Sequence, residues 1–310
     1  MIVAVVDVGT NSTRLLIADV RDGRVVRELE RRTNVTRLGE GVDETGRLSD
    51  EALERVLATC ASYREAIDEH GAERVVAVLT SAVRDADNGA DLERVLRERF
   101  AFEATTISGE REARLTFLGA TAARAHAEPL MVLDIGGGST EVVVGSDARV
   151  VFFVSTQIGS VRYTERLLHT DPPGERELAA CREAVRSQLA AAVPEDMRTL
   201  PAGGVAVAGT PTSFAAIDLA LEPYDRERVD GHRLPLERCE EILAQLGRLP
   251  VQERRQVCGL HPDRAPTIVV GGIILVEAMK LFGLSEIEVS EHDILDGTAI
   301  EAAETARKHA

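Results

Sequence analysis

Tryptophan is absent from this chain of 310 residues, and aromatic residues make up only 3% of it. Its hydrophobic cores must therefore be built mainly from Val, Leu, Ile and Ala. The longest apolar stretches, such as residues 268–276, contain glycine and are far shorter than the roughly 20 residues that cross a bilayer. The N-terminal apolar run has no basic leader and meets Asp7 early, which is typical of a buried strand. We therefore expect a cytoplasmic protein with no membrane span.

Cysteine is also scarce, and acidic residues outnumber basic ones, 52 to 36. The four cysteines lie far apart with no paired spacing, which argues against a disulfide framework and against a zinc site. A net charge of −16 repels nucleic acid at long range, so we expect no nucleic acid partner. The chain contains no Gly-Lys dipeptide and no His-Glu-x-x-His sequence, which excludes a Walker A loop and a zincin-type site.

Two similar glycine-rich turns are present, one in each half of the chain. In both, a β-rich run leads through an aspartate, Asp7 or Asp134, into a turn of small polar residues, and a second β-rich run follows. A phosphate pocket needs glycine for close approach of backbone N–H groups, and short hydroxyl or amide side chains as further donors. The residues of these types are Gly9, Thr10, Asn11, Ser12 and Thr13 in the first turn, and Gly137, Gly138, Ser139 and Thr140 in the second. The pair predicts two phosphate-binding loops in two similar half-folds that face one cleft.

The length of the chain also predicts two domains, at roughly 150 residues for each. Each half alternates strand and helix patterns in the β-α-β order of an α/β layer. We expect domains over residues 1–124 and 125–310, with a hinge near residues 120–129. The last helix, from about residue 298, is expected to pack back on the first domain.

Several local elements follow from turn and capping residues. Residues 1–33 are predicted as a three-stranded meander with a tight turn at Asp22-Gly23. A long helix should follow Ser49, which can cap it, and should end at Gly71. Residues 81–88 are predicted as a polar turn.

Three acidic residues stand near the glycine-rich turns. Asp134 ends one strand and Glu141 begins the next, so their side chains can face each other across a hairpin and share a hard divalent cation. Asp7 is the third acid, at the end of the first strand. Mg²⁺ suits such a site because it keeps several waters and takes only one or two carboxylates, and Mn²⁺ is the alternative. An ordinary Asx turn at Asp134 and an exposed strand glutamate at position 141 are the structural alternatives.

Glu112 and Arg84 are further candidates for chemistry. Glu112 lies in the first turn of a predicted helix on the same stripe as Leu115, so a partly buried carboxylate there can serve as a general base. A favourable interaction with the helix dipole is the alternative role. Arg84 can neutralise phosphate charge or pair with a neighbouring aspartate. Thr210 lies in a turn before a helix, whose N–H groups can bind an anion.

Taken together, these residues resemble the exopolyphosphatase/guanosine pentaphosphate phosphohydrolase (Ppx/GppA) family, within the actin-like, sugar-kinase-like and Hsp70-like superfamily. The resemblance covers essentially the whole chain. Its motifs are Asp7 to Thr13 with Arg14, residues 80–87, residues 108–115, Asp134 to Glu141, residues 159–162 and residues 209–212. It adds Arg14, Ser160 and Arg162 to the phosphate-binding residues.

The resemblance implies an α/β protein in which two ribonuclease-H-like domains flank a central interdomain cleft. It also implies Mg²⁺ dependence and removal of the terminal phosphate from a phosphoanhydride chain, with Glu112 as the base that activates water. We therefore expect a homodimeric exopolyphosphatase acting on inorganic polyphosphate. Guanosine pentaphosphate is the alternative substrate, and a non-catalytic phosphate- or nucleotide-sensing module is the alternative class. The segment from His292 to Gly297 departs from many relatives, which leaves its role open.

Overall fold

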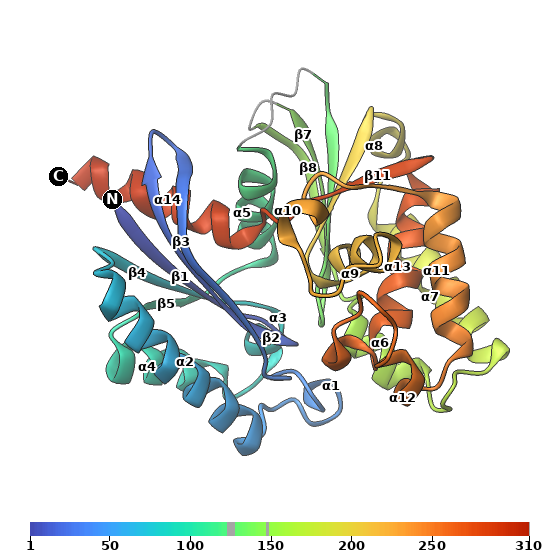
Figure 1. Ribbon diagram of the computed structural model, residues 1–310, viewed down its shortest axis with the longest axis horizontal. Helices are drawn as coiled ribbons and strands as arrows, with labels where there is room; N and C mark the ends of the chain where they lie inside the picture. The colour runs from blue at the N-terminus through green and yellow to red at the C-terminus, as the bar shows by residue number, and fades with distance from the viewer. Residues whose placement is uncertain (123–127, 147–148, 310) are drawn as a thin grey trace. The chain divides into compact units, whose positions relative to one another are not determined.

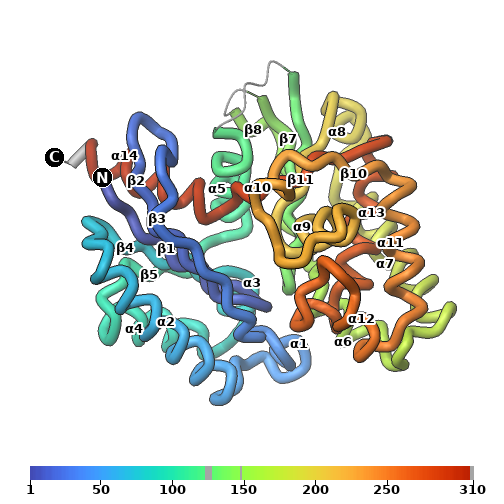
Figure 2. Tube along the Cα trace, viewed as in Figure 1, coloured from blue at the N-terminus to red at the C-terminus, as the bar shows by residue number. Residues whose placement is uncertain are grey.

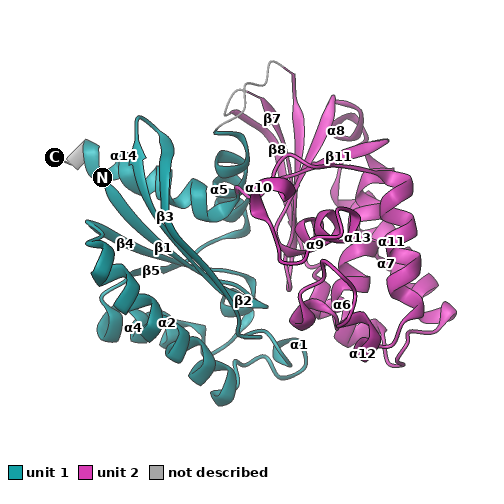
Figure 3. Ribbon diagram, in the orientation of Figure 1, with its two compact units in different colours: residues 1–124, 293–310 teal, residues 125–292 magenta. Residues whose placement is uncertain are grey.

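The computed structural model describes residues 1–122, 128–146 and 149–309. The chain divides into two compact units, shown in Figure 3: unit 1 is Met1–Arg124 with Asp293–Ala310, and unit 2 is Ala125–His292. Residues 293–310, which end the predicted second domain of residues 125–310, belong to unit 1, the unit on which the last helix is expected to pack. The predicted boundary between residues 124 and 125, and half of the predicted hinge, lie outside the described residues.

The sheet of unit 1 has five strands in the order β3-β2-β1-β4-β5 (Figure 1). Their bounds are Ile2–Val8 for β1, Ser12–Arg21 for β2, Arg24–Val35 for β3, Arg74–Leu79 for β4 and Glu103–Thr106 for β5. The first three strands form the predicted antiparallel meander, and β4 and β5 continue the sheet in parallel. The predicted turn at Asp22-Gly23 is confirmed, since both residues have positive φ, 49° and 72°.

Helices cover both faces of this sheet. They are α1 (Val42–Thr45), α2 (Asp50–His70), α3 (Ser81–Asp85), α4 (Gly89–Phe100), α5 (Gly109–Thr121) and α14 (Ile294–His309). Because side chains alternate along a strand, Ala4 and Val6 of β1 pack in one core with α2 and α4. Val3 and Val5 point the other way and pack against α14. The C-terminal helix therefore completes the second core of unit 1.

Two local predictions in unit 1 have different outcomes. The helix expected between Ser49 and Gly71 is confirmed as α2, because the Ser49 hydroxyl oxygen accepts the Ala52 N–H at 3.2 Å and Gly71 ends the helix with a φ of 62°. The polar turn predicted over residues 81–88 is wrong in its first half, which forms α3. Three residues of α3 are buried, and the Arg84 N–H donates to the Thr80 carbonyl at 2.9 Å, so burial favours a helical turn there.

The sheet of unit 2 has six strands in the order β10-β11-β9-β6-β7-β8. Their bounds are Leu130–Ile135 for β6, Thr140–Ser146 for β7, Arg149–Thr156 for β8, Gly203–Val207 for β9, Arg233–Pro235 for β10 and Glu286–Val289 for β11. The antiparallel meander β6-β7-β8, with β9 parallel to β6, repeats the arrangement of β1-β2-β3 with β4. The predicted internal repeat is therefore confirmed.

The helices of unit 2, which can be followed in Figure 2, pack around one large core. They are α6 (Ser160–Leu167), α7 (Glu175–Ala192), α8 (Glu195–Thr199), α9 (Gly209–Asp218), α10 (Arg226–Val229), α11 (Leu236–Arg248), α12 (Val251–Arg254), the 3-10 helix η1 (Pro262–Arg264) and α13 (Ile268–Leu281). Gly271 lets α13 approach α9 closely, since a Cβ there would lie 2.3 Å from the Thr210 Oγ1. Within the described ranges, no helix is both long and apolar enough to pass through a membrane.

Candidate active site

The first predicted phosphate loop, Gly9 to Ser12, connects β1 to β2. The Gly9 N–H donates to the Ser12 carbonyl at 3.0 Å, which closes a tight turn. The carbonyls of Thr10 and Asn11 accept backbone N–H groups from residues 36–39 at 2.8–3.1 Å. The loop therefore directs its carbonyls toward its own unit. The N–H groups of Thr10 and Asn11 make no hydrogen bond within the described residues.

The loop of unit 2 has the same geometry. The Gly136 N–H donates to the Ser139 carbonyl, again at 3.0 Å. The first N–H groups of α6, at residues 160–162, donate to the carbonyls of Gly136 and Gly137 at 2.9–3.1 Å. Gly159 permits this approach, because a Cβ at that position would lie 2.2 Å from the Gly137 carbonyl oxygen.

The shared geometry suits an anion in both units. When the carbonyls of a loop are held from behind, its N–H groups point the other way and form a concave site with partial positive charge. The N–H groups of Gly137 and Gly138, like those of Thr10 and Asn11, have no partner in the described part of the chain. The backbone of each loop can therefore donate to phosphate oxygens.

The threonine hydroxyls at the base of the loops make hydrogen bonds within their own units. Thr140 is fully buried and donates its hydroxyl proton to the Ile158 carbonyl at 2.6 Å, so it has no proton for a phosphate. The role of Thr140 in phosphate binding stays a prediction, with its backbone as the remaining donor. Thr13 is also buried, and its hydroxyl shares a hydrogen bond of 3.0 Å with Thr36.

Ser160 and Arg162, which the resemblance added, support the loop of unit 2 from behind. The Ser160 hydroxyl donates to the Gly136 carbonyl at 3.2 Å, and the Arg162 Nε donates to the Gly138 carbonyl at 2.8 Å. Both side chains thus help to hold the loop carbonyls away from any bound anion. Ser139 is buried next to them, at 2% exposed.

Arg14 is held between two carboxylates in unit 1. It lies directly opposite Asp7 in the register of β1 and β2, and its Nε and Nη2 donate to Asp7 Oδ2 at 2.9 and 2.7 Å. Its Nη1 contacts Asp293 Oδ2. Burial raises the pKa of the Asp7 carboxyl, and the Arg14 guanidinium opposes part of that rise. The other oxygen of Asp7, Oδ1, is buried without a hydrogen-bond partner among the described residues.

Asp134 and Glu141 lie directly opposite each other in the register of β6 and β7, as predicted. They are 8% and 1% exposed, and Glu141 Oε1 accepts the Ser155 hydroxyl at 2.6 Å. Side chains that are directly opposite project from the same face of a sheet. Two neighbouring buried carboxylates repel each other, and a hard cation bound by both removes that repulsion.

The donor set around this pair suits a sparsely coordinated ion. Where the chain is described, no group of three or more His, Cys, Asp and Glu residues is arranged to hold a metal. Asp134 and Glu141 would leave several coordination positions to water or substrate oxygens, as Mg²⁺ prefers. Asp7 belongs to unit 1, and its Oδ2 already accepts two donors from Arg14.

Glu112 and Arg84 are brought together within unit 1. The Ser108 hydroxyl oxygen caps α5 by accepting the Arg111 N–H at 3.2 Å, which places Glu112 in the first turn. Glu112 is 8% exposed, and its Oε2 accepts Arg84 Nη1 at 3.0 Å. Arg84 Nη1 also donates to the Ile107 carbonyl at 2.9 Å. The inward orientation of Glu112 is confirmed, and its partner is an arginine supplied by α3.

Thr210 lies in the first turn of α9, next to an arginine that the sequence did not indicate. A Cβ on Gly209 would lie 1.3 Å from the Arg264 Nη1, so this guanidinium lies against the start of the helix. Ala208, immediately before α9, has a positive φ of 71°, which is strained for a residue with a Cβ. A helix N-terminus next to a guanidinium favours an anion, which agrees with the predicted role of this turn.

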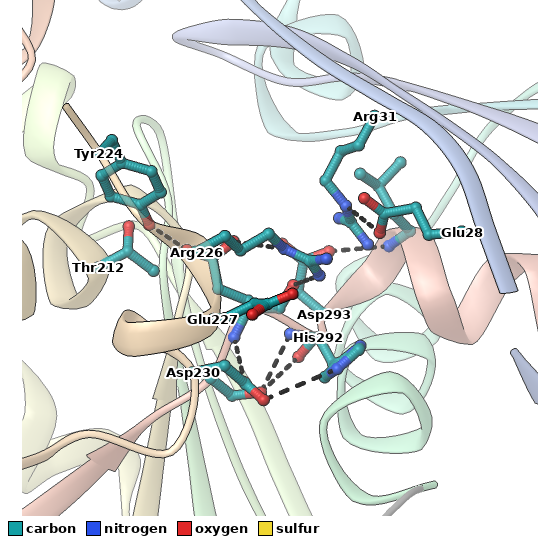
Figure 4. A network of polar contacts seen from close by, with 12 residues as sticks. Glu28, Arg31, Thr212, Tyr224, Arg226, Glu227, Asp230, His292 and Asp293 are labelled. Carbon is teal, nitrogen blue, oxygen red and sulfur yellow. Dashed lines mark hydrogen bonds and ion pairs between the residues drawn. The ribbon is translucent and has the colours of Figure 1, made fainter. Parts of the chain in front are cut away.

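His292 and Asp293 are neighbours in the sequence but have different partners. His292 Nε2 lies 3.8 Å from Asp230 Oδ2, in the network of polar contacts in Figure 4, whereas Asp293 contacts Arg14. In the same network, Tyr224 and Arg226 both donate to the Glu291 carboxylate, and the Glu291 N–H donates to Asp230 at 2.9 Å. These contacts fix α10 to the segment after β11.

Comparison with known proteins identifies the family. The family model described as the Ppx/GppA phosphatase family matches residues 16–305. Exopolyphosphatase 2 of Mycobacterium tuberculosis is 39% identical, across 97% of this chain and 98% of its own length.

Solved structures agree with this match over nearly the whole chain. An exopolyphosphatase-like protein of 33% identity superposes with a TM-score of 0.92, covering 99% of this chain and 98% of its own. The Aquifex aeolicus member of the Ppx/GppA family has 29% identity and a TM-score of 0.84, with coverage of 99% and 98%. The predicted fold class, with two domains of the actin-like kind, is confirmed by these alignments. This chain therefore belongs to the Ppx/GppA phosphatase family, a family of hydrolases.

Proposed function

We propose that this protein is an exopolyphosphatase, which releases orthophosphate from the end of inorganic polyphosphate. The observation that carries the proposal is a loop of the same geometry in each unit. The N–H of Gly9 closes one turn and the N–H of Gly136 closes the other, and hydrogen bonds from behind hold the carbonyls of both loops. A loop of this kind suits a ligand that carries phosphate groups. The similarity to exopolyphosphatase 2 of Mycobacterium tuberculosis supports the same substrate.

In the proposed reaction, Glu112 accepts a proton from a water molecule as the water oxygen attacks the terminal phosphorus. The new P–O bond forms as the bridging P–O bond on the opposite side breaks, and the electron pair of that bond stays on the shortened chain. Arg84 holds the Glu112 carboxylate in place through the contact of 3.0 Å. A general base in this position contributes about 10²–10⁴-fold to the rate.

Donors of each loop would stabilise the negative charge of the phosphate that the loop binds. Asn11 and Ser12 lie in the loop of unit 1, and Ser139 lies in the loop of unit 2. Loss of one such donor should raise the barrier by about 3 kcal/mol, as for oxyanion-type donors. Asp134 and Glu141 would hold Mg²⁺ or Mn²⁺, which supplies positive charge to the phosphate oxygens when bound.

The same groups can act on guanosine pentaphosphate, because its 5′-terminal phosphate also leaves from a phosphoanhydride. The matched family description covers both branches, Ppx and GppA, so this nucleotide is the second candidate substrate. We also propose that the protein is a homodimer and acts in the cytoplasm.

Phosphate release from short polyphosphate, long polyphosphate, guanosine pentaphosphate and ATP, with and without Mg²⁺, tests the proposed function. We expect phosphate release to be fastest from polyphosphate. Binding of polyphosphate without phosphate release would instead favour a sensing module.

Glu112→Gln tests the proposed base, with Glu110→Gln as the matched control. Glu110 lies in the same helical turn, is half-exposed and pairs with Arg114 at 3.0 Å. We expect kcat to fall by about 10²–10⁴-fold in Glu112→Gln with KM nearly unchanged. Glu110→Gln should keep the wild-type kcat. Unchanged turnover in Glu112→Gln would show that another group activates the water.

A further inference from the structure

Asp293 touches two parts of unit 1 that the proposed mechanism needs. Its Oδ2 contacts Arg14, whose Nε and Nη2 bind Asp7 at the entry of the phosphate loop. The side chains of Arg14, Asp7 and Asp293 are only 17%, 6% and 5% exposed. Buried ion pairs of this kind have few alternative partners, so they hold one geometry. The strands on both sides of the loop are therefore tied to Asp293.

The second oxygen of Asp293 and its backbone fix the other side of the contact. Asp293 Oδ1 accepts the Leu295 N–H at 3.0 Å, which stabilises the start of α14. A Cβ on Gly119 of α5 would lie only 1.8 Å from the Asp293 carbonyl oxygen. Likewise, a Cβ on Gly297 of α14 would lie 1.9 Å from the Leu115 carbonyl oxygen. The start of α14 and the middle of α5 are thus in backbone contact, with no side chain between them.

Helix α5 is the helix that carries Glu112. Asp293 therefore connects the helix of the proposed base, through Gly119, with the strands of the phosphate loop, through Arg14 and Asp7. All of these residues lie in unit 1. A change at Asp293 can alter the position of the base relative to the loop without touching either one.

We propose that Asp293 is a positioning residue, which sets the place of helix α5 and Glu112 relative to the phosphate loop Gly9 to Ser12. The inference rests on the proposed function for its effect on turnover. It assigns a role to the segment from His292 to Gly297, and it makes Arg14 a structural link between two carboxylates.

Asp293→Asn is the direct test, and Asp296→Asn is its matched control. Asparagine has one acceptor oxygen in place of two, so either Arg14 or the Leu295 N–H loses its partner. Asp296 anchors the same helix, because its Oδ2 accepts Arg31 Nη2 at 2.9 Å and the Asp293 N–H at 3.5 Å, so Asp296→Asn perturbs the start of α14 while leaving the Asp293 carboxylate in place. If Asp293 merely anchors α14, the two substitutions should have equal effects.

We expect kcat for polyphosphate to fall on the order of a hundredfold in Asp293→Asn, as for a displacement of about 1 Å at a reacting centre. KM should change by less than about threefold, because substrate donors remain present. Asp296→Asn should keep kcat near the wild-type value even if its Tm falls as far as that of Asp293→Asn. Equal kcat losses in the two variants at equal Tm shifts would overturn the proposal.

Hydrogen exchange gives a readout that does not depend on turnover. Amide exchange over residues 9–13 should become faster in Asp293→Asn and stay unchanged in Asp296→Asn. Arg14→Lys provides a second variant if Asp293→Asn does not fold, because one ammonium group cannot contact both carboxylates in the fork geometry of arginine. It should show the same loss of kcat and the same faster exchange. Unchanged exchange of residues 9–13 in the folded variants would refute the positioning role.

These results separate the two proposals. If wild-type protein releases no phosphate from any substrate of the panel, the proposed function fails, and the exchange data still decide whether Asp293 holds the loop. If wild-type protein is active and Asp293→Asn turns over normally, only the positioning role fails.

Discussion

Gly159→Ala tests whether the loop of unit 2 works through the exact placement of its backbone. Gly159 has a φ of −133° and a ψ of 151°, an extended conformation that alanine adopts without strain. The effect of the substitution must therefore come from the added methyl group. Its Cβ would lie 2.2 Å from the Gly137 oxygen, 2.4 Å from the Gly138 carbonyl carbon and 2.5 Å from the Gly137 carbonyl carbon.

The size of the displacement follows from these distances. Ordinary contacts of a Cβ begin at 3.4 Å, so the loop and α6 must separate by 3.4 − 2.2 = 1.2 Å. No side-chain rotation can absorb this movement, because the three nearest atoms are all backbone atoms. Overpacking of this kind costs about 1–3 kcal/mol of folding free energy. A displacement of about 1 Å at a reacting centre costs on the order of a hundredfold in kcat, or about 2.7 kcal/mol.

The assay is steady-state phosphate release, together with Tm from calorimetry. Gly247→Ala in α11 is the control, because its Cβ meets only Leu178 Cδ1, at 3.7 Å, and should leave kcat unchanged. We expect Gly159→Ala to lose turnover well beyond what its loss of stability explains, at a temperature where it remains folded. A folded Gly159→Ala protein with wild-type kcat would refute the idea that the unit 2 loop binds phosphate through its backbone.

Three further predictions concern other positions. Gly39→Ala would place its Cβ 2.2 Å from the Thr10 Cγ2, so the single variant should have a lower kcat. Thr10→Ser removes that methyl group, so the double variant should regain the wild-type kcat. Glu141→Gln should raise the Mg²⁺ concentration for half-maximal phosphate release at least about tenfold, and an unchanged Mg²⁺ titration would contradict its role as a ligand. The pKa of Glu177 is lowered from 4.5 to about 2, first by the Thr170 hydroxyl and then by backbone N–H groups. A carboxyl group whose pKa is lowered on folding stabilises the folded state at every pH above its unfolded pKa. Glu177→Gln should therefore lower Tm by its full amount above pH 4.5, and the Tm difference from the wild type should vanish as the pH falls to 2.

Local features of the fold could be predicted from the sequence because the responsible residues are close together. The capping serine of α2 and the glycine that ends it stand at the two ends of one helix. Asp134 and Glu141 face each other because a short glycine-rich turn joins two strands, and the period of two places both side chains on one face. The repeated loops were predictable for the same reason.

Contacts between distant segments could not be predicted in this way. Arg84 and Glu112 are 28 residues apart, and Arg14 and Asp293 are 279 residues apart. No periodicity connects such positions, so the sequence offered only phosphate and the neighbouring aspartates as candidate partners for Arg84. The proton of Thr140 is committed to a carbonyl 18 residues away, which sequence reasoning could not distinguish from a free donor.

The discontinuity of unit 1 has a consequence for how the protein is made. Residues 125–292 are contiguous, so unit 2 can assemble from a single uninterrupted stretch as it leaves the ribosome. Unit 1 must wait for its closing helix, because Val3, Val5 and Leu16 bury one face of the sheet against α14. Until synthesis has passed residues 294–309, the first half of the polypeptide exposes an apolar sheet face that chaperones would recognise. A nonsense codon near position 293 should therefore yield an aggregating product even though both glycine-rich turns have been translated.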